Sequence, residues 1–82
     1  MASRSVRILD ISAGGVLLAS SVPADVGTRG RLSLNIAGHP LATDVEIRRV
    51  FAPPDQAGFR LGAMFVGLTR AQQDTIERFT RA

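Results

Sequence analysis

Apolar and polar residues alternate with a period of two in three stretches of this chain. In residues 31–36 three aliphatic side chains would share one face, and a similar alternation recurs over residues 43–48 and 59–65. Successive side chains of a β-strand point to opposite faces, so each stretch predicts a strand with one buried face. The sequence Gly-His-Pro at residues 38–40 lies between the first two stretches and favours a short turn in an antiparallel hairpin.

The N-terminal third has a less regular pattern. Val6 and Ile8 predict a short strand, which Ser-Ala-Gly-Gly at residues 12–15 interrupts before apolar residues 16–19 predict a second strand. Two consecutive glycines predict a tight turn that needs either a positive φ or a close backbone approach. Residues 20–29 contain one proline and one glycine and are predicted to form a connecting loop.

Near the C-terminus the hydrophobic period changes to that of a helix. Thr69 and Gln72 have the spacing of a capping box, and Ile76 and Phe79 fall on one face of the predicted helix. About five short strands followed by one helix predict a mainly β fold, a small antiparallel barrel or sandwich with the helix packed against it. We expect a single domain over residues 1–82.

The composition narrows the class of protein. A chain of 82 residues with a formal net charge of +3 makes one small domain, too short for an enzyme with a cleft between two lobes. It has no cysteine, which excludes disulfides and thiolate metal sites. Its longest apolar run is far shorter than the roughly 18 residues that cross a bilayer, and no export signal is seen, so we expect a cytoplasmic location without membrane insertion. All ten basic residues are arginine, a side chain that binds phosphate bidentately.

Few residues are suited to catalysis. His39 is the only histidine, so no His-based triad or metal site can be assembled, and the glycine-rich phosphate loops of nucleotide-binding proteins are absent. Asp44 and Glu46 are two apart on one predicted strand, but the arginines beside them favour a solvated charged face over a cation site. The four phenylalanines fall mostly on predicted inward faces, which leaves no stacking platform for nucleic acid. We therefore expect no enzyme activity, cofactor, metal ion or nucleic-acid partner.

A six-residue motif at residues 10–15 is more specific about function than the composition is. Asp10, Ser12 and Gly15 fit the (Asp/Asn)-x-Ser-x-x-Gly pattern of PilZ domains, bacterial receptors for the second messenger cyclic di-GMP. The resemblance continues through Arg-Arg-Val at residues 48–50, a Gly-x-x-Phe strand at residues 62–65 and the closing helix. The chain thus resembles this family over nearly its whole length. The resemblance implies a PilZ-like β-barrel and a non-enzymatic module that binds cyclic di-GMP.

The same resemblance implies roles for the motif residues. Asp10 would accept hydrogen bonds from a guanine edge, Ser12 would offer a hydroxyl to a base or phosphate, and Gly15 would let the turn approach the ligand. Asp and Ser before a Gly-Gly turn also commonly hydrogen-bond to their own backbone, so a purely local role is the alternative.

The chain departs from the family at its N-terminus. Family members that bind the nucleotide carry an Arg-x-x-x-Arg segment ahead of a first strand, whereas Arg4 and Arg7 are the only basic residues before Asp10. These two arginines are the candidate phosphate contacts, although side chains three apart in an extended strand point to opposite faces. The domain is therefore predicted to be N-terminally truncated relative to the six-stranded family barrel, with about five strands and an open edge.

An open strand edge exposes unpaired backbone groups and favours pairing with another chain. The sequence thus leaves two functions open. One is a cyclic di-GMP receptor module, and the other is a degenerate PilZ-like adaptor that does not bind the nucleotide. The adaptor would act through a protein partner or self-association at the exposed edge.

Overall fold

The computed structural model describes residues 6–80 of the chain. Five strands and one helix follow one another along it: β1 (Val6–Ser12), β2 (Gly15–Ser20), β3 (Arg29–Ile36), β4 (His39–Phe51), β5 (Phe59–Val66) and α1 (Arg70–Thr80). The fold is mainly β with a C-terminal helix, which confirms the predicted fold class.

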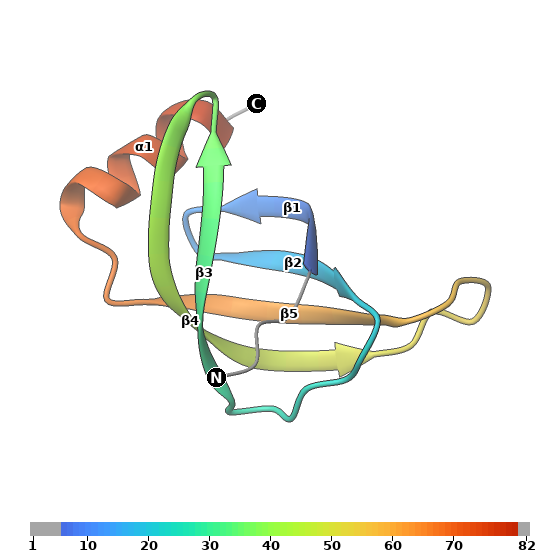
Figure 1. The fold of residues 1–82 in the computed structure, drawn as a ribbon. Helices are drawn as coiled ribbons and strands as arrows, with labels where there is room; N and C mark the ends of the chain where they lie inside the picture. The colour runs from blue at the N-terminus through green and yellow to red at the C-terminus, as the bar shows by residue number, and fades with distance from the viewer. Residues whose placement is uncertain (1–5, 81–82) are drawn as a thin grey trace.

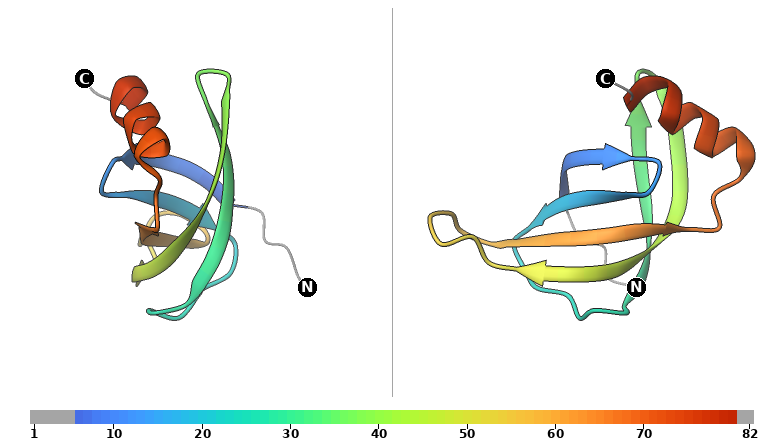
Figure 2. Two further views of the ribbon diagram at one scale, coloured as in Figure 1. Left: turned by 90° about the vertical axis from the view of Figure 1, so that its left-hand side faces the viewer. Right: turned by 180° about the vertical axis from the view of Figure 1, so that it is seen from behind.

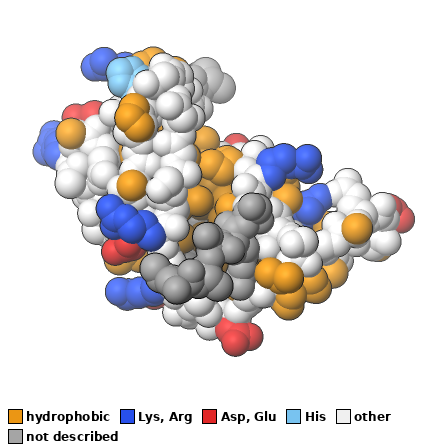
Figure 3. All heavy atoms as spheres, in the orientation of Figure 1, with side chains coloured by type: hydrophobic (Ala, Val, Ile, Leu, Met, Phe, Trp, Pro, Cys, Tyr) orange, Lys and Arg blue, Asp and Glu red, His pale blue; other side chains and the backbone are white. Residues whose placement is uncertain are grey.

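The five strands form one antiparallel sheet in the order β1-β2-β5-β4-β3. The sheet curls into a half-barrel with β1 and β3 as its edges (Figure 1). Within residues 6–80 each edge strand pairs with one neighbour only, so a seam remains between them, and the predicted open edge is present. Figure 3 shows hydrophobic side chains between these two strands. The partly buried apolar residues that β1 and β3 contribute are Val6, Ile8, Ile11 and Leu34.

Two irregularities in the strand register change which side chains face the core. Leu9 of β1 has no partner on β2, and Arg48 of β4 has no partner on β5. Each extra residue is a β-bulge, which shifts the inward–outward alternation of its strand by one position. The bulge at Leu9 lets Ile8 and Ile11, three residues apart, both pack against the core. Because the bulges interrupt the alternation in β1 and β4, the period of two in the sequence predicted shorter strands than those observed.

The hairpin between β3 and β4 turns one residue earlier than the sequence predicted. The two-residue loop is Ala37-Gly38, with φ angles of 51° and 87°. Positive φ at both central residues is characteristic of the type I′ turn, whose twist matches that of the flanking strands. His39 and Pro40, predicted to form the turn, begin β4 instead. β5 pairs only with residues 44–51 of β4. Pro40 therefore has no strand beside it on the β5 side, and its missing N–H removes no hydrogen bond between strands there.

The helix α1 lies across one end of the half-barrel, close to β1 and the tip of the β3–β4 hairpin (Figure 2). The predicted capping box forms: Thr69 Oγ1 accepts from the Gln72 N–H at 3.1 Å, and the Thr69 N–H donates to Gln72 Oε1 at 3.0 Å. The Gln72 side-chain amide also donates to the Ala42 carbonyl of β4 at 3.0 Å, which fixes the start of the helix against the sheet.

Ile76 anchors the helix in the core, with 0% of its surface exposed. Phe79, predicted on the same inward face, is 41% exposed and stacks on His39 with 5.0 Å between the ring centroids. Phe51 is exposed as well, so the expectation that the phenylalanines mostly point inward was wrong for two of the four. No helix within residues 6–80 is long and apolar enough to cross a membrane. The buried apolar core consists of Val16, Leu18, Leu32, Ile36, Leu41, Val45, Ile47, Leu61, Ala63, Phe65 and Ile76.

Candidate functional site

Asp10 and Ser12 lie on the outer face of the sheet, which is the face opposite the core. Their partners on β2 are Leu17 and Gly15, which alternate with the buried residues of that strand. Both motif side chains are exposed. Arg7 pairs with Ala19 and faces the same side, because the bulge in β1 adds one residue between Arg7 and Asp10. The structure therefore brings three sequence-predicted residues onto one exposed face.

Asp10 makes a local hydrogen bond of the kind considered as the alternative to a ligand role. Its Oδ1 accepts the N–H of Ile11 at 2.9 Å in an exposed position. An ionised carboxylate has about four lone-pair sites, so most of its accepting capacity remains. Ser12 lines a depression of about 330 Å³, together with Ala13 in the turn after β1 and Glu77 of α1. The carboxylate of Glu77 makes this depression unfavourable for a phosphate, so Ser12 is better placed for a base than for an anion.

Gly15 has a packing role within the sheet. A Cβ at this position would lie 2.5 Å from the carbonyl oxygen of Ala63 on β5, a distance that no side chain tolerates. Neither Gly14 nor Gly15 has a positive φ. Of the two predicted reasons for the glycine pair, close backbone approach is therefore correct for Gly15, where the approaching group is the backbone of β5, and neither reason applies to Gly14.

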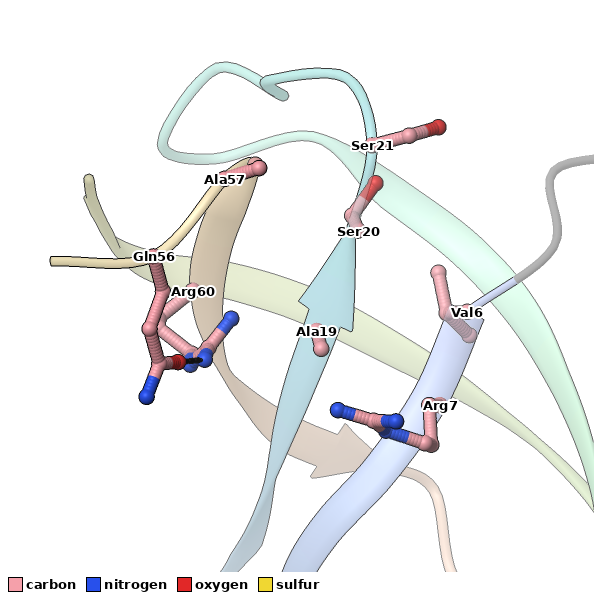
Figure 4. A pocket seen from close by; sticks show the side chains of 9 residues that line it. Val6, Arg7, Ala19, Ser20, Ser21, Gln56, Ala57 and Arg60 are labelled. Carbon is pink, nitrogen blue, oxygen red and sulfur yellow. Dashed lines mark hydrogen bonds between the residues drawn. The ribbon is translucent and has the colours of Figure 1, made fainter. Parts of the chain in front are cut away.

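Arg7 lines an open depression of about 670 Å³ beside the start of β1, drawn in Figure 4. Arg7 and Arg60 stand on either side of Ala19, and the Arg60 guanidinium donates to the side-chain oxygen of Gln56. Arg4, the other candidate phosphate contact, lies outside the described residues. We name this depression the arginine hollow; its lining residues are Val6, Arg7, Ala19, Ser20, Ser21, Gln56, Ala57, Gly58 and Arg60.

The sequence pattern did not single out Arg60. It reaches the arginine hollow because β5 pairs with β2, two strands that are far apart in the chain. The only available signal was that Arg60 alternates with apolar residues in the stretch 59–65, which predicts that it faces outward. Asp10, Ser12 and Gly15 do not line the hollow, so the motif and the hollow are separate parts of the same face.

The acidic residues of β4 are occupied by arginines. Glu46 contacts Arg29 at 3.1 Å and Arg48 at 2.9 Å, and Asp44 contacts Arg31 at 3.2 Å. The hydrogen bond from Arg48, followed by the one from Arg29, lowers the pKa of the Glu46 carboxyl below its usual value. Within residues 6–80 no group of three or more potential ligand side chains gathers to hold a metal ion. The two carboxylates of β4 are thus both engaged by arginines of β3 and β4.

Comparison with known proteins identifies the family. The family model described as the PilZ domain matches residues 2–82, which confirms the resemblance seen in the motif and in the order of the elements. No curated protein and no solved structure gives a significant match to the chain.

Proposed function

The chain belongs to the PilZ domain family, and from this premise we propose that it is a non-enzymatic module that binds cyclic di-GMP on the outer face of β1 and β2. The observation that carries the proposal is the bulge at Leu9, which places Arg7, Asp10 and Ser12 on one exposed face. A nucleotide with two phosphates and guanine edges needs both positive charge and a hydrogen-bond acceptor. This face supplies both.

In this proposal each motif residue has a distinct role. Asp10 accepts hydrogen bonds from the N–H groups of a guanine edge through the capacity that its bond to Ile11 leaves free. Ser12 contributes its exposed hydroxyl to the base. Gly15 acts indirectly, because its missing side chain lets β2 pair with β5 and so holds the end of β1 in place. Arg7 supplies charge to a phosphate.

The proposal places the protein in the cytoplasm, where a second messenger of this kind is sensed, and assigns it no catalytic step. Binding without turnover agrees with the composition of the outer face. Its arginines and Asp10, a carboxylate without an ion pair to any residue of the range 6–80, can bind an anionic nucleotide, and within that range they form no pair of acid and base suited to proton transfer.

A degenerate adaptor that acts through protein contacts is the second candidate function. The observation that favours it is the seam between β1 and β3, whose edges each have one strand partner within residues 6–80. Unpaired backbone groups along such an edge can pair with a strand of a partner protein or of a second copy.

The two functions are separated by an amide NMR titration of the 82-residue chain with cyclic di-GMP at physiological salt, with GTP as the control for general anion binding. We expect perturbations at residues 7 and 10–15. Asp10→Ala should weaken binding about 10- to 150-fold, since a hydrogen bond to a charged group contributes about 1.5–3 kcal/mol.

The matched control is Asp25→Ala, which removes the same charge from the exposed loop between β2 and β3. Its affinity should equal that of the wild type within about twofold, because Asp25 is exposed, lies outside β1 and does not line the arginine hollow, and salt screens exposed charges. A well-dispersed spectrum that does not respond to cyclic di-GMP would favour the adaptor. Equal affinities of the two variants would remove Asp10 from the site.

A further inference from the structure

The arginines of the sheet divide into two groups according to their ion pairs. Three arginines of β3 and β4 contact the carboxylates of Asp44 or Glu46. Arg7 of β1, Arg49 of β4 and Arg60 of β5 form no ion pair with another residue of the described part of the chain, and of these Arg49 lies over the ring of Phe51, 5.8 Å from its centroid. The charges of Arg7 and Arg60 are therefore not neutralised by the sheet that carries them.

The strand register sets Arg7 and Arg60 opposite each other. Ala19 of β2 pairs with Arg7 on one side and with Arg60 on the other. Neighbouring strands lie about 4.8 Å apart, so the two arginine Cα atoms are separated by about 10 Å, and extended guanidinium groups can meet between them. The residue between them is an alanine, whose methyl group leaves the space above β2 open. Figure 4 shows Arg7 reaching from β1 towards β2, with Arg60 on the far side of Ala19.

The other residues that line the arginine hollow do not supply a counter-charge. No aspartate or glutamate is among them. The Ser20 hydroxyl is occupied, since it donates to the Val22 carbonyl at 2.7 Å, whereas Ser21 is exposed. Gln56 holds Arg60 through a neutral amide oxygen, which orients the guanidinium without cancelling its charge. Two arginines and a hydroxyl around an open space form a suitable environment for a phosphate, because a guanidinium presents paired donors to phosphate oxygens.

The arginine hollow lies beside Asp10 on the outer face of the sheet. Ala19 and Leu17, the partners of Arg7 and Asp10, are two residues apart on β2, a spacing of about 7 Å. We propose that Arg7 and Arg60 together grip one phosphate of the nucleotide whose guanine contacts Asp10. This inference rests on the proposed function and adds to it a phosphate subsite built from two non-adjacent strands.

The affinity of the 82-residue chain for cyclic di-GMP tests this subsite. The variants are Arg7→Gln, Arg60→Gln, the double variant Arg7→Gln/Arg60→Gln, and the control Arg31→Gln. The control removes the same charge from edge strand β3, where Arg31 contacts Asp44 at 3.2 Å. Arg60→Lys keeps the charge and removes the paired donors. Amide spectra check that every variant is folded.

We expect each single Gln variant to bind about 10- to 150-fold more weakly than the wild type, and the control within about twofold. The double variant should lose less than the product of the two single losses, because both side chains hold the same phosphate. Arg60→Lys should fall between the wild type and Arg60→Gln. If Arg60→Gln unfolds, Arg7→Gln and Arg60→Lys decide the outcome.

Three results would contradict the proposal in different ways. A wild-type chain that does not bind cyclic di-GMP would overturn both the proposed function and the subsite. Wild-type binding that is lost in Asp10→Ala but equal in Arg60→Gln and the Arg31→Gln control would overturn the subsite alone. Single losses that multiply fully in the double variant would contradict a shared phosphate.

Discussion

Replacing Gly15 with alanine tests whether this motif glycine serves the sheet or the ligand. An alanine Cβ would lie 2.5 Å from the carbonyl oxygen of Ala63 and 3.5 Å from its carbonyl carbon. The contact group is backbone in the middle of the sheet, paired to both β2 and β4, so it cannot rotate away as a flexible side chain would. The strand pair must therefore separate locally to admit the methyl group.

The size of the effect follows from the contact. Inserting a methyl group into a fully packed position destabilises a protein by about 1–3 kcal/mol. A domain of this size has a total stability of roughly 8 kcal/mol, at about 0.1 kcal/mol per residue. One kcal/mol lowers the midpoint of thermal unfolding by about 4–8 °C in domains of 60–100 residues, so we expect a decrease of roughly 5–20 °C.

Gly14→Ala is the matched control. The same Cβ at Gly14 would find nothing nearer than the Ser12 hydroxyl at 3.9 Å, and neither glycine has a positive φ. Both substitutions restrict the unfolded chain equally, so the difference between their unfolding midpoints, measured by circular dichroism, isolates the clash with β5. Equal midpoints would refute the packing role and would favour a direct role of Gly15 in ligand binding.

Two other substitutions test the core and the charged face. Ile76→Ala should lower the free energy of unfolding in urea by about 2–5 kcal/mol, because it empties a completely buried position. Phe79→Ala should lower it by less, because Phe79 is 41% exposed. The reverse order would show that the stack of Phe79 on His39 holds the helix in place. Glu46→Gln should reduce stability at neutral pH, and the gap to the wild type should narrow in acid. The folded-state pKa of Glu46 is lowered by Arg48 and Arg29, so its contribution is present above the unfolded-state pKa and is lost as the pH falls through the folded-state pKa. The measurement is thermal unfolding of both proteins from neutral to acidic pH. A stability difference that stayed constant over this pH range would contradict the prediction.

Local sequence patterns predicted the elements because local physics determines them. The alternation in residues 31–36 and 59–65 matches β3 and β5, and the Thr69–Gln72 capping box forms at the start of α1. The limits of β1 and β4 were harder to predict, because a bulge interrupts the alternation in each strand. A signal was present in β4: Arg48 and Arg49 are two consecutive polar residues between two apolar ones, the pattern that a bulged strand leaves.

The site could be predicted only in part. The resemblance pointed to Asp10 and Ser12, whose side chains are exposed, and their role in binding stays a prediction. The sharing of one face by Arg7 and Asp10 was not foreseen, since residues three apart in a regular strand point in opposite directions. Arg60 was missed because its position depends on the pairing of β2 with β5, which no local period encodes.

The bulge at Leu9 makes residues 7–12 a single transferable unit for protein design. A graft that copied only Asp10, Ser12 and the turn onto a regular strand would orient the motif correctly but turn the residue equivalent to Arg7 towards the new core. Deleting Leu9 from the present chain would have a different result: Arg7 and Asp10 would be two residues apart on a regular strand, in step with Ala19 and Leu17, and would still share one face. Residue counts between functional positions on a β-strand therefore have meaning only together with the register of that strand.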